Sequence, residues 1–149
     1  MYRHFHLAAN GMIVKGNKIL LHHRTDCDMW DLPGGGLEKG ETIFQTLRRE
    51  VKEETGLNIK PIKLTGVYQN YRKEIFVFNF LVKVISGKLT KNKEADDFKY
   101  FDFKSLPKNM PAKQKERILD FFNNKNKITL RVQRSKASID HPLTPSRGK

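Results

Sequence analysis

The chain has 149 residues, 38% of them hydrophobic, which is enough for one folded domain with a buried core and excludes a wholly disordered chain. No apolar run reaches the roughly 18–20 residues of a membrane-spanning helix, and the N-terminus lacks the apolar core of a signal peptide. The single cysteine, Cys27, cannot form an internal disulfide, so we expect a cytoplasmic protein.

The formal net charge of +13 is unevenly distributed along the chain. Residues 104–149 hold 12 Lys and Arg against 3 Asp and Glu, whereas residues 1–103 hold 17 against 13. A basic segment attracts polyanions, including nucleotides and nucleic acids, without specifying which. It serves equally well as a feature that keeps the protein soluble.

The first elements in chain order are two strands. Residues 6–14 are mostly apolar, a Lys-Gly-Asn turn follows, and residues 18–23 form a second apolar run, so this segment predicts a β-hairpin. A polar stretch leads into residues 30–36, Trp-Asp-Leu-Pro-Gly-Gly-Gly, which predict a rigid loop.

A helix follows this loop. The Thr42 hydroxyl can cap its first turn while Gln45 reaches back, as in a capping box. Ile43, Leu47 and Val51 recur every four residues and predict the buried face. Gly56 is placed to end the helix in a left-handed cap.

The second half of the chain predicts strands over residues 64–71 and 74–85, a short aromatic strand over 98–103 and a helix over 113–122. Strands on both sides of a helix, followed by a last helix, predict an α/β fold, an α/β/α sandwich with a mixed sheet. We expect one domain over residues 1–123. Residues 124–149 are expected to form a basic C-terminal extension, with residues 133–149 as a flexible tail.

The predicted central helix carries Glu50, Glu53 and Glu54 within two turns. Residues three and four apart share a helix face, so these carboxylates lie close together. Carboxylates held together repel one another unless a cation lies among them, and oxygen ligands favour Mg²⁺ or Mn²⁺. A solvated acidic helix face is the alternative, and the pair Glu50 and Glu54 alone would favour it.

The surrounding sequence favours the metal site over the solvated helix face. From Gly35 the chain reads Gly, five residues, Glu41, seven residues, then Arg-Glu-Val-Lys-Glu-Glu-Thr-Gly-Leu through Leu57. This pattern resembles the signature of the Nudix hydrolases position for position. The resemblance extends over roughly residues 5–123, and it implies the same α/β/α sandwich and hydrolysis of a diphosphate linkage with Mg²⁺, for which Mn²⁺ is a possible substitute.

The resemblance also implies roles for single residues. Glu53 and Glu54 are expected to bind the metal, Glu50 either binds metal or acts as the general base, and Gly34 or a neighbour offers a backbone carbonyl. Arg49 is expected to orient a box glutamate, and we include it with Glu50, Glu53 and Glu94 among the catalytic candidates. Glu41, Gly35 and Gly56 are expected to be structural.

Outside the signature, Glu94 precedes Tyr100-Phe101 at a spacing at which Nudix enzymes recruit a further glutamate. The alternative is an acid of a charged loop, with Asp96 and Asp97 as weaker substitutes. Arg24 is a candidate for substrate phosphates or a surface arginine. Tyr71 is a candidate for stacking on a base, although aromatic residues in strands more often belong to the core.

The resemblance leaves the substrate open. A nucleoside triphosphate or a nucleoside diphosphate linked to another group is expected; the proline typical of ADP-ribose hydrolases has no counterpart, because Pro61 is too near the signature and Pro107 too far. One alternative is an RNA 5′-end pyrophosphohydrolase, which would hold RNA through the basic C-terminal region and lose activity without residues 124–149. The other is a non-catalytic nucleotide sensor. Homodimers are common among such proteins.

Overall fold

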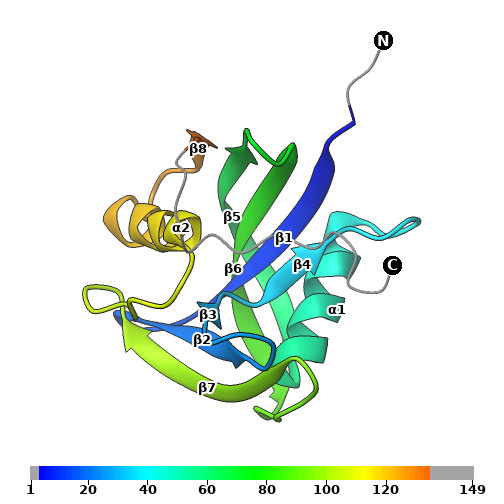
Figure 1. Cartoon of the computed structure of the whole chain (residues 1–149), viewed down its shortest axis with the longest axis vertical. Coiled ribbons are helices and arrows are strands. Elements are labelled where there is room, and N and C mark those ends of the chain that lie inside the picture. The colour runs from blue at the N-terminus through cyan, green and yellow to red at the C-terminus, as the bar shows by residue number, and fades with distance from the viewer. Residues whose placement is uncertain (1–3, 135–149) are drawn as a thin grey trace.

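The computed structural model describes residues 4–134, which form one mixed sheet with a helix on each face (Figure 1). The helices are α1, Ile43–Thr55, and α2, Ala112–Asn123. The strands are β1 His6–Lys15, β2 Lys18–Arg24, β3 Trp30–Asp31, β4 Gly34–Gly36, β5 Leu57–Asn70, β6 Ile75–Gly87, β7 Ala95–Asp102 and β8 Thr129–Gln133. The predicted α/β class is confirmed. Neither helix in this part of the chain is long and apolar enough to cross a membrane.

The eight strands are ordered β3-β2-β1-β6-β5-β8, with β4 paired to β1 and β7 paired to β2. Strand β1 runs parallel to β6 and β5 runs parallel to β8, whereas the remaining pairs are antiparallel. The central strand β1 therefore contacts the glycine-rich strand β4 as well as the long β5–β6 hairpin. This arrangement brings the loop before α1 against the middle of the sheet.

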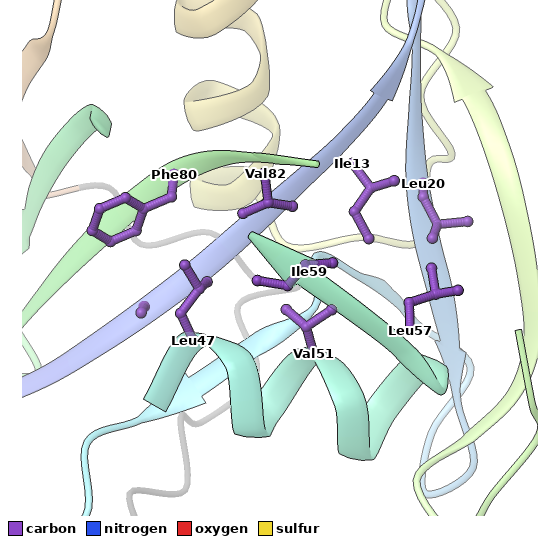
Figure 2. Packing of buried hydrophobic residues seen from close by; sticks show 9 residues of the cluster. Ile13, Leu20, Leu47, Val51, Leu57, Ile59, Phe80 and Val82 are labelled. Carbon is purple, nitrogen blue, oxygen red and sulfur yellow. The ribbon is translucent and has the colours of Figure 1, made fainter. Parts of the chain in front are cut away.

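Helix α1 packs one apolar face on the sheet. Leu47 and Val51 are fully buried and meet Ile13, Phe80 and Val82 from β1 and β6 (Figure 2). Each aliphatic side chain buried in this way stabilises the fold by roughly 1.5–3 kcal/mol. The packing fixes the rotation of α1, and with it the direction in which the helix presents its glutamates.

Helix α2 packs on the opposite face. Its residues Ile118, Phe121 and Phe122 join a second cluster that includes Met12 of β1. Met12 and Ile13 are neighbours in one strand, and successive side chains of a strand point to opposite faces, so β1 supplies both cores.

The ends of α1 agree with the sequence. The Thr42 hydroxyl accepts a hydrogen bond from the Gln45 backbone N–H, and the Gln45 side chain accepts one from the Thr42 N–H, which completes the predicted capping box. Gly56 ends the helix in the left-handed conformation, with φ 85°.

Three strands were not predicted. The loop expected over residues 30–36 contains the two short strands β3 and β4. Strand β8 follows the expected domain boundary at residue 123 and pairs in parallel with β5. Gln133, assigned above to a flexible tail, is 2% exposed in β8, while the rest of that predicted tail lies, from residue 135 onward, outside the described residues.

Candidate functional site

Three glutamates from two distant segments of the chain meet at one place. A carboxylate oxygen from each of Glu50, Glu54 and Glu94 lies within 4.8 Å of the other two. Glu50 and Glu54 come from successive turns of α1, and Glu94 comes from the residue just before β7. Glu50 and Glu54 are buried, so the cluster lies under the surface rather than on a solvated helix face.

The glycine-rich strand β4 makes room for this cluster. A Cβ atom on Gly35 would lie 2.4 Å from the carboxyl carbon of Glu50, so only glycine allows the backbone to pass this close. A Cβ atom on Gly34 would lie 2.2 Å from the Ala9 carbonyl oxygen. The Gly34 backbone N–H donates to the Glu54 carboxylate at 2.7 Å, so the described role of Gly34 is to hold a glutamate through its N–H.

His22 is the second neighbour of Glu54. Its Nε2 lies 3.9 Å from Glu54 Oε2, and both side chains are buried. His23, the next residue of β2, points elsewhere: its ring nitrogens lie 2.7 Å from Asp96 and 2.8 Å from Asp28. The two histidines therefore do not form a pair, as expected from adjacent positions in a strand.

The Arg49 guanidinium donates hydrogen bonds to three glutamates. Its guanidinium forks onto Glu41 at 2.6 and 3.0 Å, and the same group reaches Glu50 at 3.1 Å and Glu53 at 2.9 Å. It also donates to the Gly36 carbonyl at 3.3 Å. The hydrogen bond from Arg49 lowers the pKa of Glu41 to about 2, and the hydrogen bond to Glu41 raises the pKa of Arg49.

Glu53 differs from its two helical neighbours. Its side chain is 46% exposed and contacts Arg49, and it is not among the three glutamates that converge. The structure therefore brings together Glu50, Glu54 and Glu94 and places Glu53 beside them, on the side of Arg49. Gly56 lies at the end of the same helix in a left-handed conformation, where a Cβ atom would clash with the Lys88 carbonyl of the loop after β6.

Glu94 is held by a turn that the sequence analysis missed. The Asn92 side-chain oxygen accepts a hydrogen bond from the Glu94 backbone N–H at 2.8 Å. Asparagine often closes such a turn on the residue two positions ahead, and this was the available signal. The sequence predicts a site role for Glu94, with an acid of a charged loop as the alternative, but it does not predict this turn.

Arg24 lies at the end of β2, paired with Ala95 at the start of β7. Its guanidinium donates to Asp26 at 2.7 and 2.5 Å and to Asp31 at 3.2 Å. The hydrogen bond from Arg24 lowers the pKa of Asp26 to about 2. Arg24 is thus close in the fold to the Glu94 loop, but its described contacts are with aspartates.

Tyr71 comes directly after the last residue of β5. The C-terminus of α1, in contrast, connects to the first residue of β5. The turn that contains it lies at the opposite end of the β5–β6 hairpin from the C-terminus of α1 (Figure 1). Its ring is 47% exposed and the Arg134 guanidinium lies 4.4 Å from the ring centre. The structure does not bring Tyr71 to the glutamates.

The donor set at the cluster is made of carboxylate oxygens. Hard divalent cations such as Mg²⁺ and Mn²⁺ prefer these ligands, and Mg²⁺ is commonly held by a few carboxylates together with substrate phosphates. Three carboxylates within 4.8 Å fit such an ion. Glu50, Glu54 and Glu94 are the residues that would hold it.

The comparison with protein families agrees with this geometry, since residues 4–136 match the NUDIX domain family. The chain belongs to this family. Nudix hydrolases generally use divalent metals, which agrees with the carboxylate cluster. The protein is a hydrolase, and its relatives are named pyrophosphatases and diphosphatases.

Two relatives illustrate the range within the Nudix family. A protein of Methanocaldococcus jannaschii named ADP-ribose pyrophosphatase is 37% identical over 133 residues, which cover 85% of this chain and 78% of the relative. A protein of Buchnera aphidicola named 8-oxo-dGTP diphosphatase is 32% identical, covering 64% of this chain and 82% of the relative. The relatives act on nucleotides, but their named substrates differ.

Solved structures show the same fold. A NUDIX hydrolase from Nitrosomonas europaea superposes with a TM-score of 0.79 at 19% identity, covering 91% of this chain and 82% of that one. A UDP-X diphosphatase superposes with a TM-score of 0.75 at 27% identity, covering 87% and 68% of the two chains.

Proposed function

We propose that the protein is a Mg²⁺-dependent pyrophosphohydrolase that cleaves the diphosphate linkage of a nucleoside triphosphate or of a nucleoside diphosphate joined to another group. The observation that carries this proposal is the convergence of Glu50, Glu54 and Glu94 within 4.8 Å. A bound divalent ion would neutralise diphosphate oxygens and lower the pKa of a coordinated water. Water attack at phosphorus is the reaction that such a site favours.

The residues of the site have different roles in this proposal. Glu54 is fixed by the Gly34 N–H and Glu50 by the Arg49 guanidinium, so both carboxylates are oriented before substrate binds. We propose Glu50, Glu54 and Glu94 as ligands, with Glu50 as the alternative general base. Glu53 is proposed as a further ligand from the exposed side of the helix. Arg49 is proposed to act by positioning.

Arg24 and Tyr71, the two residues predicted to bind substrate, have a smaller part in this proposal. Arg24 lies near the Glu94 loop, and we propose that it meets substrate phosphates only if its contacts with Asp26 and Asp31 open. Tyr71 is proposed as a base-stacking residue only for a base that reaches the far turn of the β5–β6 hairpin, away from the glutamates.

The named substrates of the relatives define the test. Purified protein is incubated with Mg²⁺ and ADP-ribose, UDP-sugars, 8-oxo-dGTP and ordinary nucleoside triphosphates, and phosphate-containing products are followed. We expect turnover of at least one class, its loss with EDTA and its return with Mg²⁺ or Mn²⁺. Glu54→Gln is expected to abolish it. Full turnover by Glu54→Gln, or by the protein in EDTA, would contradict the proposal.

An RNA with a 5′-triphosphate belongs in the same panel. Lys125, Lys127 and Arg134 lie in and around the edge strand β8, where they offer a basic surface to a polyanion. An RNA enzyme would lose activity steeply between about 50 and 200 mM salt. A free-nucleotide enzyme would change much less over this range.

A further inference from the structure

The Asn92 side chain bridges the two parts of the chain that build the carboxylate cluster. On one side, its Nδ2 donates to the backbone carbonyl of Glu54, in the last turn of α1, at 3.0 Å. On the other, its Oδ1 accepts from the backbone N–H groups of Glu94 at 2.8 Å and Ala95 at 3.0 Å. One amide thus contacts two of the three residues whose carboxylates converge.

The two ends of this amide are not interchangeable. A backbone carbonyl only accepts and a backbone N–H only donates, so Nδ2 must face Glu54 and Oδ1 must face Glu94. Nδ2 also donates to the Thr90 carbonyl at 3.1 Å, and the Thr90 N–H donates to the Thr55 carbonyl at 3.0 Å. The loop between β6 and β7 is therefore attached to the end of α1 at two neighbouring points.

We propose that Asn92 is a positioning residue that sets the distance between the Glu94 carboxylate and the Glu50–Glu54 pair. This inference rests on the proposed metal role of Glu94. Glu50 and Glu54 share the rigid frame of α1, whereas Glu94 reaches the cluster from a loop, so its position depends on how that loop is anchored. Outer residues that orient metal ligands typically contribute ten- to a hundredfold to metal affinity.

The surroundings of Asn92 make the proposal testable without loss of the fold. Asn92 lines an open cavity of about 420 Å³ together with Lys52, Glu53, Gly56, Gly87, Lys88 and Thr90. If the amide is removed, water can enter from this cavity and bond to the Glu54 carbonyl and the Glu94 N–H. Truncation here therefore leaves no dry unsatisfied group of the kind that unfolds a core.

The test measures metal binding directly. Free Mn²⁺ is counted by electron paramagnetic resonance with the full-length protein and no substrate, and unfolding is followed in parallel. Asn92→Ala is expected to raise the Kd for Mn²⁺ by about ten- to a hundredfold. In activity assays it should raise the Mg²⁺ concentration for half-maximal rate, with the KM for nucleotide at saturating Mg²⁺ nearly unchanged. An unaltered Kd for Mn²⁺ overturns the proposal.

Thr90→Val is the matched control. Thr90 lies in the same loop and lines the same cavity, but its hydroxyl donates to the Lys88 carbonyl and touches neither Glu54 nor Glu94. It should leave the Kd for Mn²⁺ unchanged; a shift equal to that of Asn92→Ala would assign the effect to general loosening of the loop and overturn the proposal. Asn92→Ser, whose shorter hydroxyl can still close the local turn, is the second variant if Asn92→Ala does not fold. It should raise the Kd in the same direction.

Glu94→Gln separates this inference from the proposed function. If Asn92 acts through Glu94, Asn92→Ala should add little once Glu94→Gln is in place, so the two effects are non-additive. Equal effects of Asn92→Ala in both backgrounds overturn the positioning role. If Glu94→Gln itself leaves Mn²⁺ binding intact, the metal role of Glu94 is wrong, and the proposed function fails at that residue.

Discussion

Polar networks that include buried side chains occupy both faces of the sheet, but on one face three glutamates also converge. On the face covered by α2, Arg131 forks onto Asp120 at 2.9 and 2.7 Å, and Tyr68 donates to the same carboxylate at 3.0 Å. Arg117 donates to Gln133 at 3.1 and 3.0 Å. The buried Asp120 carboxylate is thus paired with the Arg131 guanidinium at the edge of this face.

The face covered by α1 is different. Five glutamates lie on or beside this helix, at positions 41, 50, 53, 54 and 94, and the guanidinium of Arg49 contacts three of them. The remaining two converge with Glu50; Glu50 and Glu54 are buried, and Glu94 is half-buried. Bringing carboxylates together costs free energy unless a cation offsets their repulsion.

The contrast teaches that a buried polar network does not by itself indicate a functional site. The α2 network is complete within the protein and stabilises the fold. The α1 cluster brings three carboxylates within 4.8 Å of one another, and a divalent ion would offset their repulsion. Four predictions test this difference.

Among these four, the largest effect is expected at Glu50. Glu50→Gln keeps the shape of the side chain but removes its charge from the cluster, so kcat should fall by more than about a hundredfold, beyond the effect of an outer residue. Glu116→Gln, which alters the acceptor of a 2.8 Å hydrogen bond from Gln133 on the α2 face, should leave kcat unchanged. Equal losses in both variants would remove the distinction between the faces.

Arg49→Lys is expected to have the next largest effect. Lysine keeps the positive charge but cannot fork onto Glu41 while also reaching Glu50 and Glu53. We expect kcat/KM to fall about ten- to a hundredfold through misplaced glutamates. Arg131→Lys, which loosens the corresponding fork on the α2 face, should reduce stability slightly and leave kcat/KM intact. Steady-state kinetics on both variants decides this.

The Glu41–Arg49 pair predicts a pH dependence of stability. The pKa of Glu41 is lowered from 4.5 to about 2 in the folded protein. A depressed pKa stabilises the fold above the unfolded pKa, and this contribution is lost as pH falls from 4.5 toward 2. The free energy of unfolding should thus drop between pH 6 and pH 3 by about 1–2 kcal/mol more in the parent than in Glu41→Gln. Urea titrations at both pH values measure it, and identical drops would contradict the assignment.

The smallest effect is expected at Tyr68. Tyr68→Phe removes one buried hydrogen bond to Asp120, which keeps its fork to Arg131. The free energy of unfolding should fall by about 1 kcal/mol with no change in kcat. A loss of activity larger than the loss of stability explains would show that the α2 face takes part in the reaction.

Features encoded within a few residues were predictable from the sequence. The capping box at Thr42, the left-handed Gly56 and the shared face of Glu50 and Glu54 each depend on spacings of three or four residues, and all appear in the structure. The convergence of Glu94 with them was expected only through the family resemblance. No local pattern places residue 94 beside residue 54.

Features that depend on distant partners were not predictable. The role of Asn92 requires knowing that the end of α1 lies against the β6–β7 loop. Strand β8 carries Arg131 and Gln133 between exposed apolar residues, so its sequence resembles a basic tail. Its inward side chains find their partners only because α2 returns the chain to the edge of β5.

The position of β8 has a consequence for any attempt to shorten this protein. Cutting after Asn123 deletes the outermost strand, exposes the backbone of β5, and removes Arg131 from Asp120 and Gln133 from Arg117. Such a fragment would tend to aggregate, and its loss of activity would be mistaken for a loss of RNA binding. Truncation after Arg134 instead keeps every strand of the sheet. It therefore tests the contribution of the last fifteen residues alone.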